Sequence, residues 1–224
     1  MSGAGRIVAV ALLTTLAACG SFAPQKTRYA RWLDAGHRVD VERYGAFLRS
    51  EGVHDVVPMP ALTLTARSWR RCGDREYDVP PDALQPNMPP TLRLVVRLRD
   101  AGILDPTRAR SVYRDPAMNT CAGGSARSKH LENRAIDFDL PKRGDNVERL
   151  CAFWREHGQA LNMGLGFYTA TAIHVDTAGY RTWGGDYTWR TSLCTPPQPP
   201  TPAPAPDPKA RRGTAGQNVS RTAA

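Results

Sequence analysis

Two short segments of this 224-residue chain alternate apolar and polar residues, and they constrain its fold more than any other feature. The first reads AIDFDL over residues 135–140, and the second reads AIHVDT over residues 172–177. A period of two is typical of a strand with one buried face. The polar faces of these two strands carry Asp137 with Asp139, and His174 with Asp176. Because unpaired buried charge is costly, these side chains need solvent, a cation or a metal.

Other segments predict helices and connections around the two strands. Apolar residues recur at helical spacing over residues 29–51, 91–104 and 147–162. Residues 111–119 read as a short strand that ends at Pro116, and MGLGFY over residues 163–168 reads as a glycine-punctuated turn. The length of the chain suits one domain with accessory segments.

The N-terminal segment has the features of an export signal. Arg6 is followed by an apolar run that is too short for a mature membrane span, and LAAC over residues 16–19 resembles a bacterial lipobox. This resemblance implies cleavage before Cys19 and lipidation of its thiol, with Gly20 favouring the outer membrane. We therefore expect an exported, lipid-anchored protein in the bacterial envelope that faces the periplasm. The alternative is an ordinary signal peptide that is cut nearby.

The expected compartment indicates the chemical state of the remaining cysteines. Four are left: Cys72, Cys121, Cys151 and Cys194. An even number in an oxidising compartment predicts two disulfides, with three possible pairings. Metal ligation by these thiols is the weaker alternative, because none of them forms a CxxC motif.

The net charge of +9 allows several anionic partners. The basic residues are spread along the chain, and no basic run with interleaved aromatic residues occurs. We therefore expect an anionic cell wall or membrane surface as the partner, and no nucleic acid.

A third candidate ligand lies before the first strand. His130 precedes that strand by a short loop, and Asp137 and His174 lie on the polar strand faces. Two histidines and one aspartate with an open fourth position for water can form a catalytic zinc site. Zinc in such a site lowers the pKa of a water ligand toward about 7.

These residues resemble a known family. SKHLENRAID over residues 128–137 is similar to the SxHxxGxAxD motif of the zinc D-alanyl-D-alanine carboxypeptidases, which include vancomycin-resistance carboxypeptidases and dipeptidases. SVYRDPAMN resembles the YR segment before that motif, and IHVDTAGYRTW resembles the second histidine motif of one branch. The resemblance covers residues 85–190 and implies the α+β fold shared with lysostaphin-type peptidases and hedgehog domains. In that fold, a small central antiparallel sheet carries zinc on one face and helices on the other.

The resemblance also implies roles for individual residues. Carried over one by one, His130, Asp137 and His174 would bind Zn²⁺. Arg114 would correspond to the arginine that steadies the scissile carbonyl oxygen or the substrate carboxylate, since a guanidinium is always charged and forms paired hydrogen bonds. Ser128 matches the motif serine, which supports the site or touches the substrate terminus; a loop-capping hydroxyl is the alternative.

Two positions depart from the motif. Asn133 replaces its glycine, and asparagine also tolerates a left-handed backbone. Thr171 stands where relatives usually carry an acidic general base, three residues before the last histidine, and threonine cannot accept that proton. Asp176 is the best replacement, because it shares a strand face with His174. It would act either as the base or as a residue that orients an imidazole or an arginine.

The expected function is that of a zinc-dependent peptidoglycan peptidase with a zinc-activated water. It would be a D-alanyl-D-alanine carboxypeptidase or a related murein endopeptidase, acting as a monomer on stem peptides. One alternative is a zinc-containing but catalytically weak peptidoglycan-binding envelope lipoprotein, and another is a metal-free lipoprotein stabilised by disulfides.

The resulting organisation has five parts. They are a lipoprotein signal peptide (1–18), a tether (19–28), an N-terminal helical and loop extension (29–84), a zinc peptidase domain (85–194) and a proline-rich disordered tail (195–224).

Overall fold

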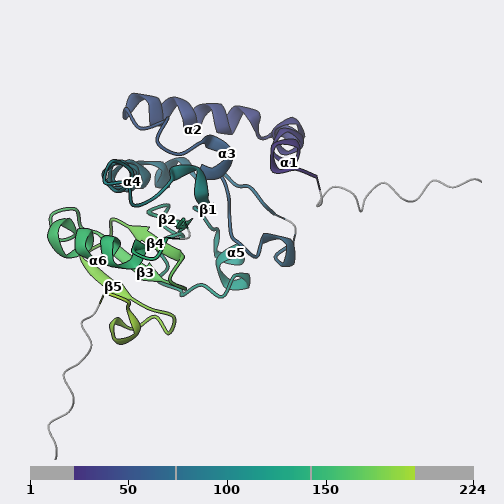
Figure 1. Cartoon of the computed structure of the whole chain (residues 1–224). Helices are drawn as coiled ribbons and strands as arrows, with labels where there is room; N and C mark the ends of the chain where they lie inside the picture. The colour runs from purple at the N-terminus through teal and green to yellow at the C-terminus, as the bar shows by residue number, and fades with distance from the viewer. Residues whose placement is uncertain (1–22, 74, 142, 195–224) are drawn as a thin grey trace, which may run out of the picture.

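The computed structural model describes residues 23–73, 75–141 and 143–194. Five strands form one sheet in the order β1-β2-β4-β3-β5 (Figure 1). Their bounds are β1 (Ala109–Ser111), β2 (Ala135–Asp139), β3 (Gly164–Phe167), β4 (Ala172–Asp176) and β5 (Arg181–Trp183). Neighbouring strands are antiparallel except β3 and β5, which run parallel. The α+β class expected from the sequence is confirmed, with one parallel pair in an otherwise antiparallel sheet.

Helices α2 and α4 lie along one side of the sheet, and α6 lies near β3 and β4 (Figure 1). The helices are α1 (Gln25–Trp32), α2 (Arg38–Ser50), α3 (Met59–Leu62), α4 (Met88–Asp100), α5 (Pro116–Cys121) and α6 (Asn146–His157). The helix expected over residues 29–51 is broken, because Gly36 adopts a φ of 111° in the wider turn Leu33–His37 between α1 and α2.

The apolar face of the sheet anchors the core. On β2 and β4, Phe138 and Val175 have no exposed surface. The same hydrophobic cluster contains Leu48 of α2, Leu92 of α4 and Leu150 of α6. Because alternate residues of a strand face opposite ways, the polar residues of β2 and β4 lie on the other side of the sheet, away from this cluster.

Two sequence-based expectations for local structure were wrong. Residues 163–168 were expected to form a turn, but most of them form β3, with Leu165 and Phe167 buried in the core. The strand expected over residues 111–119 ends at its first residue, and α5 begins at Pro116. The side chain of Asp115 caps that helix by accepting a hydrogen bond from the Met118 backbone N–H at 2.7 Å. Proline suits the first turn because its missing N–H would have no helical partner there.

Both expected disulfides are present, and the structure establishes their pairing. Cys72 pairs with Cys121, the last residue of α5. This disulfide joins the segment that contains Cys72 to the C-terminal end of that helix. Cys151 of α6 pairs with Cys194, which lies after β5.

Several sequence-based predictions concern residues that the structure does not describe, or boundaries that it does not test. The signal peptide (1–18), Cys19 and the tail (195–224) lie outside the described residues. The domain boundaries stay predictions. None of the helices that the structure describes combines the length and the apolar character needed to cross a membrane.

Candidate metal centre

The pairing of β2 with β4 brings two of the predicted ligands together. Asp137 lies directly opposite His174 in the antiparallel register. His130 reaches the same point from the loop before β2. Asp137 Oδ1 lies 3.1 Å from His130 Nε2 and 3.0 Å from His174 Nδ1, and the two ring nitrogens are 3.1 Å apart. The structure therefore brings together three buried groups that could hold a metal ion.

The far side of each imidazole is already occupied. His130 Nδ1 lies 2.5 Å from the backbone oxygen of Val112, and His174 Nε2 lies 2.9 Å from Asp176 Oδ2. Such partners select the tautomer and hold the ring, so that the other nitrogen is available to a metal. His130 Nε2 and His174 Nδ1 are the nitrogens that face Asp137.

The surroundings of the three groups shift their protonation. Burial and the nearby Arg114 lower the pKa of His130 to about 4, so its imidazole is neutral at pH 7. Burial also opposes the charged form of His174, but its contacts with Asp137 and Asp176 outweigh burial and raise its pKa. For Asp137, burial favours the neutral acid, yet His130, His174 and Arg114 hold the pKa well below its usual range.

Arg114 is fixed against the second oxygen of the central carboxylate. Its Nη2 donates to Asp137 Oδ2 at 2.7 Å, while its Nε donates to Ser111 Oγ at 2.9 Å. Its side chain is 8% exposed. The two imidazoles contact the other oxygen, Oδ1, and Arg114 places a permanent positive charge at the cavity wall.

Asp176 lies behind His174 and does not line the cavity. Its carboxylate accepts hydrogen bonds from Arg181 at 2.6 and 3.0 Å and from the Ala178 backbone N–H at 2.8 Å. Burial would raise the pKa of Asp176, but His174 and Arg181 outweigh it and lower the pKa to about 2. Of the two roles that the sequence left open for Asp176, these contacts are those of a residue that orients the imidazole.

Residues on one face of β3 and just after this strand contribute to the site, and the sequence did not predict them. Tyr168, just after β3, donates a hydrogen bond to Asp137 Oδ1 at 3.2 Å. A Cβ at Gly166 would lie 2.0 Å from the Trp183 ring, and one at Gly164 would lie 2.4 Å from Asp176. The available signal was the spacing: glycines two residues apart in a strand often mark a close approach of neighbours.

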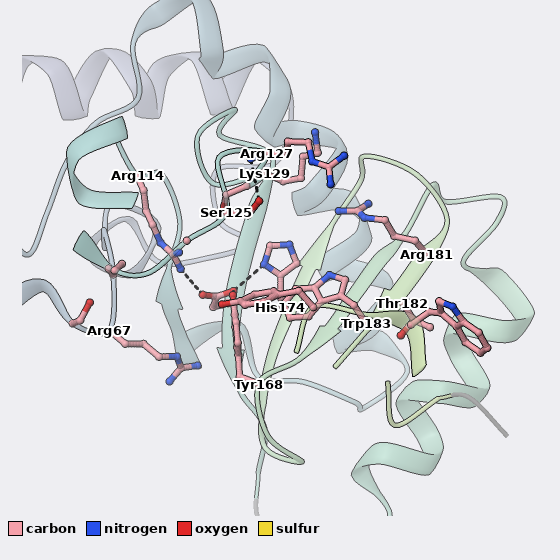
Figure 2. A pocket seen from close by; sticks show the side chains of 18 of the residues that line it. Arg67, Arg114, Ser125, Arg127, Lys129, Tyr168, His174, Arg181, Thr182 and Trp183 are labelled. Carbon is pink, nitrogen blue, oxygen red and sulfur yellow. Dashed lines mark hydrogen bonds and ion pairs between the residues drawn. The ribbon is translucent and has the colours of Figure 1, made fainter. Parts of the chain in front are cut away.

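A cavity of about 770 Å³ opens beside this centre (Figure 2). Trp183 forms part of its wall, with its ring centroid 5.4 Å from that of His174. Tyr180 does not line the cavity and stacks on Trp154, with the ring centroids 4.4 Å apart. Ser128 lines the cavity, and its Oγ accepts a hydrogen bond from the His130 backbone N–H at 3.4 Å.

The two departures from the motif have clear positions. Asn133 adopts a left-handed φ of 51°, which explains how asparagine replaces the motif glycine. Thr171 is exposed in the turn between β3 and β4 and does not line the cavity. Asp137 is the one carboxylate among the described residues that line it.

A family model described as Peptidase M15 matches residues 62–176 of the chain. The chain belongs to the peptidase M15 family. M15 peptidases are zinc-dependent metallopeptidases, so the family of this chain is a family of hydrolases, as the sequence predicted. Searches of curated proteins and of solved structures found no match.

The side chains of this M15 peptidase fit a zinc ion. Zinc accepts imidazole nitrogens and a carboxylate oxygen, and catalytic zinc sites use three protein ligands. Here all three candidate ligand atoms lie within 4.8 Å of one another, and both imidazoles have partners on their far nitrogens. The group His130, Asp137 and His174 therefore has the donor chemistry and the support that zinc requires.

Proposed function

We propose that this M15 peptidase hydrolyses peptide bonds in peptidoglycan stem peptides, as a D-alanyl-D-alanine carboxypeptidase or a related murein endopeptidase. The observation that carries the proposal is the convergence of His130, Asp137 and His174 beside an open cavity, in a chain of this family. His130, Asp137 and His174 would hold the zinc ion. Bound zinc would supply a Lewis acid for the scissile carbonyl and a water of lowered pKa.

Two hydrogen-bond donors lie close to the carboxylate of Asp137. Arg114 contacts Oδ2 and Tyr168 contacts Oδ1, and both side chains line the cavity. Burial and the negative charge of Asp137 raise the pKa of Tyr168, so its phenol keeps its proton. A charged guanidinium and a neutral phenol at this position suit a carbonyl oxygen that gains negative charge during hydrolysis. We assign them to that oxygen.

Asp176 acts as a positioning residue in this proposal. It accepts from His174 Nε2 and is neutralised by Arg181, so the imidazole is held with Nδ1 toward Asp137. Loss of such a partner typically weakens metal binding or activity.

The predicted envelope location agrees with two features of the chain. Both disulfides suit an oxidising compartment. A lipid anchor at Cys19 would keep the cavity near peptidoglycan, and the net charge of +9 favours an anionic wall.

Digestion of purified muropeptides tests the proposal. The zinc-loaded protein is incubated with stem pentapeptides and with cross-linked dimers, and the products are identified by mass spectrometry. Release of D-alanine would indicate a carboxypeptidase, and conversion of dimers to monomers would indicate an endopeptidase. A zinc-loaded, folded protein that forms neither product would contradict the proposal.

A further inference from the structure

The cavity beside the metal centre is strongly cationic. Figure 2 shows Arg127 and Lys129 close together at one edge of it, with Arg67 near another edge. Its described lining contains six cationic side chains and one carboxylate, that of Asp137. The cationic residues are Arg67, Arg71, Arg114, Arg127, Lys129 and Arg181.

Four of these six cations already have a carboxylate partner. The pairs are Arg114 with Asp137, Arg67 with Asp139, Lys129 with Glu132, and Arg181 with Asp176. Arg71 and Arg127 differ, because they form no ion pair with any residue in the part of the chain that the structure describes. Both are exposed at the cavity wall.

The backbone that carries these two arginines is held in place. Arg71 immediately precedes Cys72, whose disulfide partner Cys121 ends α5. The loop that follows α5 leads to Arg127, and Asn119 secures it by donating from Nδ2 to the Ser125 backbone oxygen at 2.9 Å. The disulfide therefore ties together the two segments from which the arginines extend into one cavity. Such a tether lowers the cost of ordering both segments when a ligand binds.

Another part of the wall is aromatic. Trp183, Tyr187 and Trp189 line it, and the last two are more than half exposed, at 57% and 54%. Aromatic rings offer apolar contact to the body of a peptide, whereas guanidinium groups bind carboxylates through paired, charge-assisted hydrogen bonds. The cavity thus suits a short peptide that carries a free carboxylate near its cationic side.

We infer that Arg71 and Arg127 form a subsite for a free carboxylate of the substrate. The inference rests on the proposed peptidase function and makes it more specific, because it selects peptides with a free C-terminal carboxylate over the same peptides with that end blocked. Arg114 is separate from this subsite, since it lies at Asp137, where we place the scissile carbonyl oxygen.

Binding of a matched pair of peptides tests the inference. The zinc-loaded protein is titrated with acetyl-L-Lys-D-Ala-D-Ala as the free acid and as the C-terminal amide, and each peptide is checked for cleavage afterwards. We expect the acid to bind about tenfold more tightly than the amide, as loss of one charge-assisted contact predicts. Arg71→Gln and Arg127→Gln should each remove most of this preference and leave the affinity for the amide unchanged. If a peptide is cut during titration, the ratio of kcat/KM for acid and amide replaces the ratio of affinities.

Arg97→Gln is the matched control, because Arg97 is an exposed arginine of α4 that does not line the cavity. It should keep the full preference for the acid. Equal binding of acid and amide by the unaltered protein would overturn the inference. So would equal weakening of both peptides by Arg127→Gln, which would indicate a general electrostatic effect. Since binding needs no turnover, a preference for the acid without any cleavage would retain the subsite and reject the peptidase function.

Discussion

At the centre of the polar face formed by β2 and β4, Asp137 lies opposite His174. At the two ends of this strand pair, which we call the edges of the polar face, Asp139 and Asp176 each lie opposite an alanine. The central carboxylate contacts two imidazoles and Arg114. Of the edge carboxylates, Asp139 contacts arginines alone, and Asp176 contacts Arg181 and one imidazole, that of His174. The three aspartates share one residue type and one face. What separates them is the set of side chains that other parts of the chain bring to each position.

The comparison shows how a metal site can be distinguished from an ion pair. Asp139 is partly exposed and bonded to Arg67 and Arg110, so its charge is satisfied within the protein. Asp137 is 1% exposed and shares one oxygen between two ring nitrogens. Only the central position brings two imidazole nitrogens to one buried carboxylate oxygen, whereas Asp176 contacts a single imidazole. The following substitutions test this difference between centre and edges, in order of decreasing expected effect.

Removing a ligand at the centre should have the largest effect. His130→Ala takes away one of three ligand atoms, so we expect loss of bound zinc and of peptidase activity to the detection limit. Zinc content is measured on the purified protein, and activity on muropeptides. Asp139→Asn, at the edge of the same face, is the control and should keep its zinc. Full zinc content in His130→Ala would contradict the assignment of the centre.

Tyr168→Phe tests a central donor that binds no metal in our assignment. Removing one donor to a developing oxyanion typically lowers kcat by about 10²–10³-fold, and we expect a loss in that range. Zinc content should stay unchanged, which separates this effect from damage to the site. Tyr180→Phe removes a hydroxyl outside the cavity and should leave kcat unaltered. A Tyr168→Phe protein with normal kcat would remove the phenol from the mechanism.

Asp176→Asn tests the edge that supports a ligand. The asparagine amide oxygen can still accept from His174 Nε2, but the negative charge that strengthens this hydrogen bond is lost, and the zinc affinity should fall by about 10–100-fold. Competition with a chelator measures this affinity. If Asp176 were the general base instead, the variant would keep its zinc affinity and lose activity alone.

Asp139→Asn should have the smallest effect, because it changes an edge carboxylate with no ligand next to it. Burial would raise the pKa of Asp139, but hydrogen bonds from Arg110 and Arg67 outweigh it and lower the pKa. The stabilisation is therefore present above the unfolded-state pKa and is lost as the pH falls through the folded-state value.

We expect Asp139→Asn to lower the free energy of unfolding by about 1 kcal/mol or less at neutral pH, since the pair is partly exposed. The difference from the unaltered protein should shrink below the ordinary aspartate pKa of about 3.9. Denaturant unfolding of both proteins at neutral pH and below the ordinary aspartate pKa measures this difference in the free energy of unfolding. A difference that grows in acid would show that the charge of Asp139 does not stabilise the fold.

Much of the centre could be predicted from local patterns. The period of two in residues 135–140 and 172–177 identified β2 and β4 and the faces of Asp137 and His174, because backbone geometry alone makes side chains alternate. The resemblance around SKHLENRAID indicated His130. The glycine spacing in β3 was read as a turn, since glycine is common in both settings and its strand role depends on the bulky Trp183 beside it.

The sequence by itself therefore determined the residue types available for chemistry, the faces of two strands and the presence of two disulfides. Only the tertiary structure decided which cysteines pair, which of three aspartates contacts both imidazoles, that Asp176 lies behind His174, and that Tyr168 reaches Asp137. The physical reason is range. A periodic pattern reflects the backbone geometry of neighbouring residues, whereas the partner of a charged group comes from distant chain segments that meet only when the core packs.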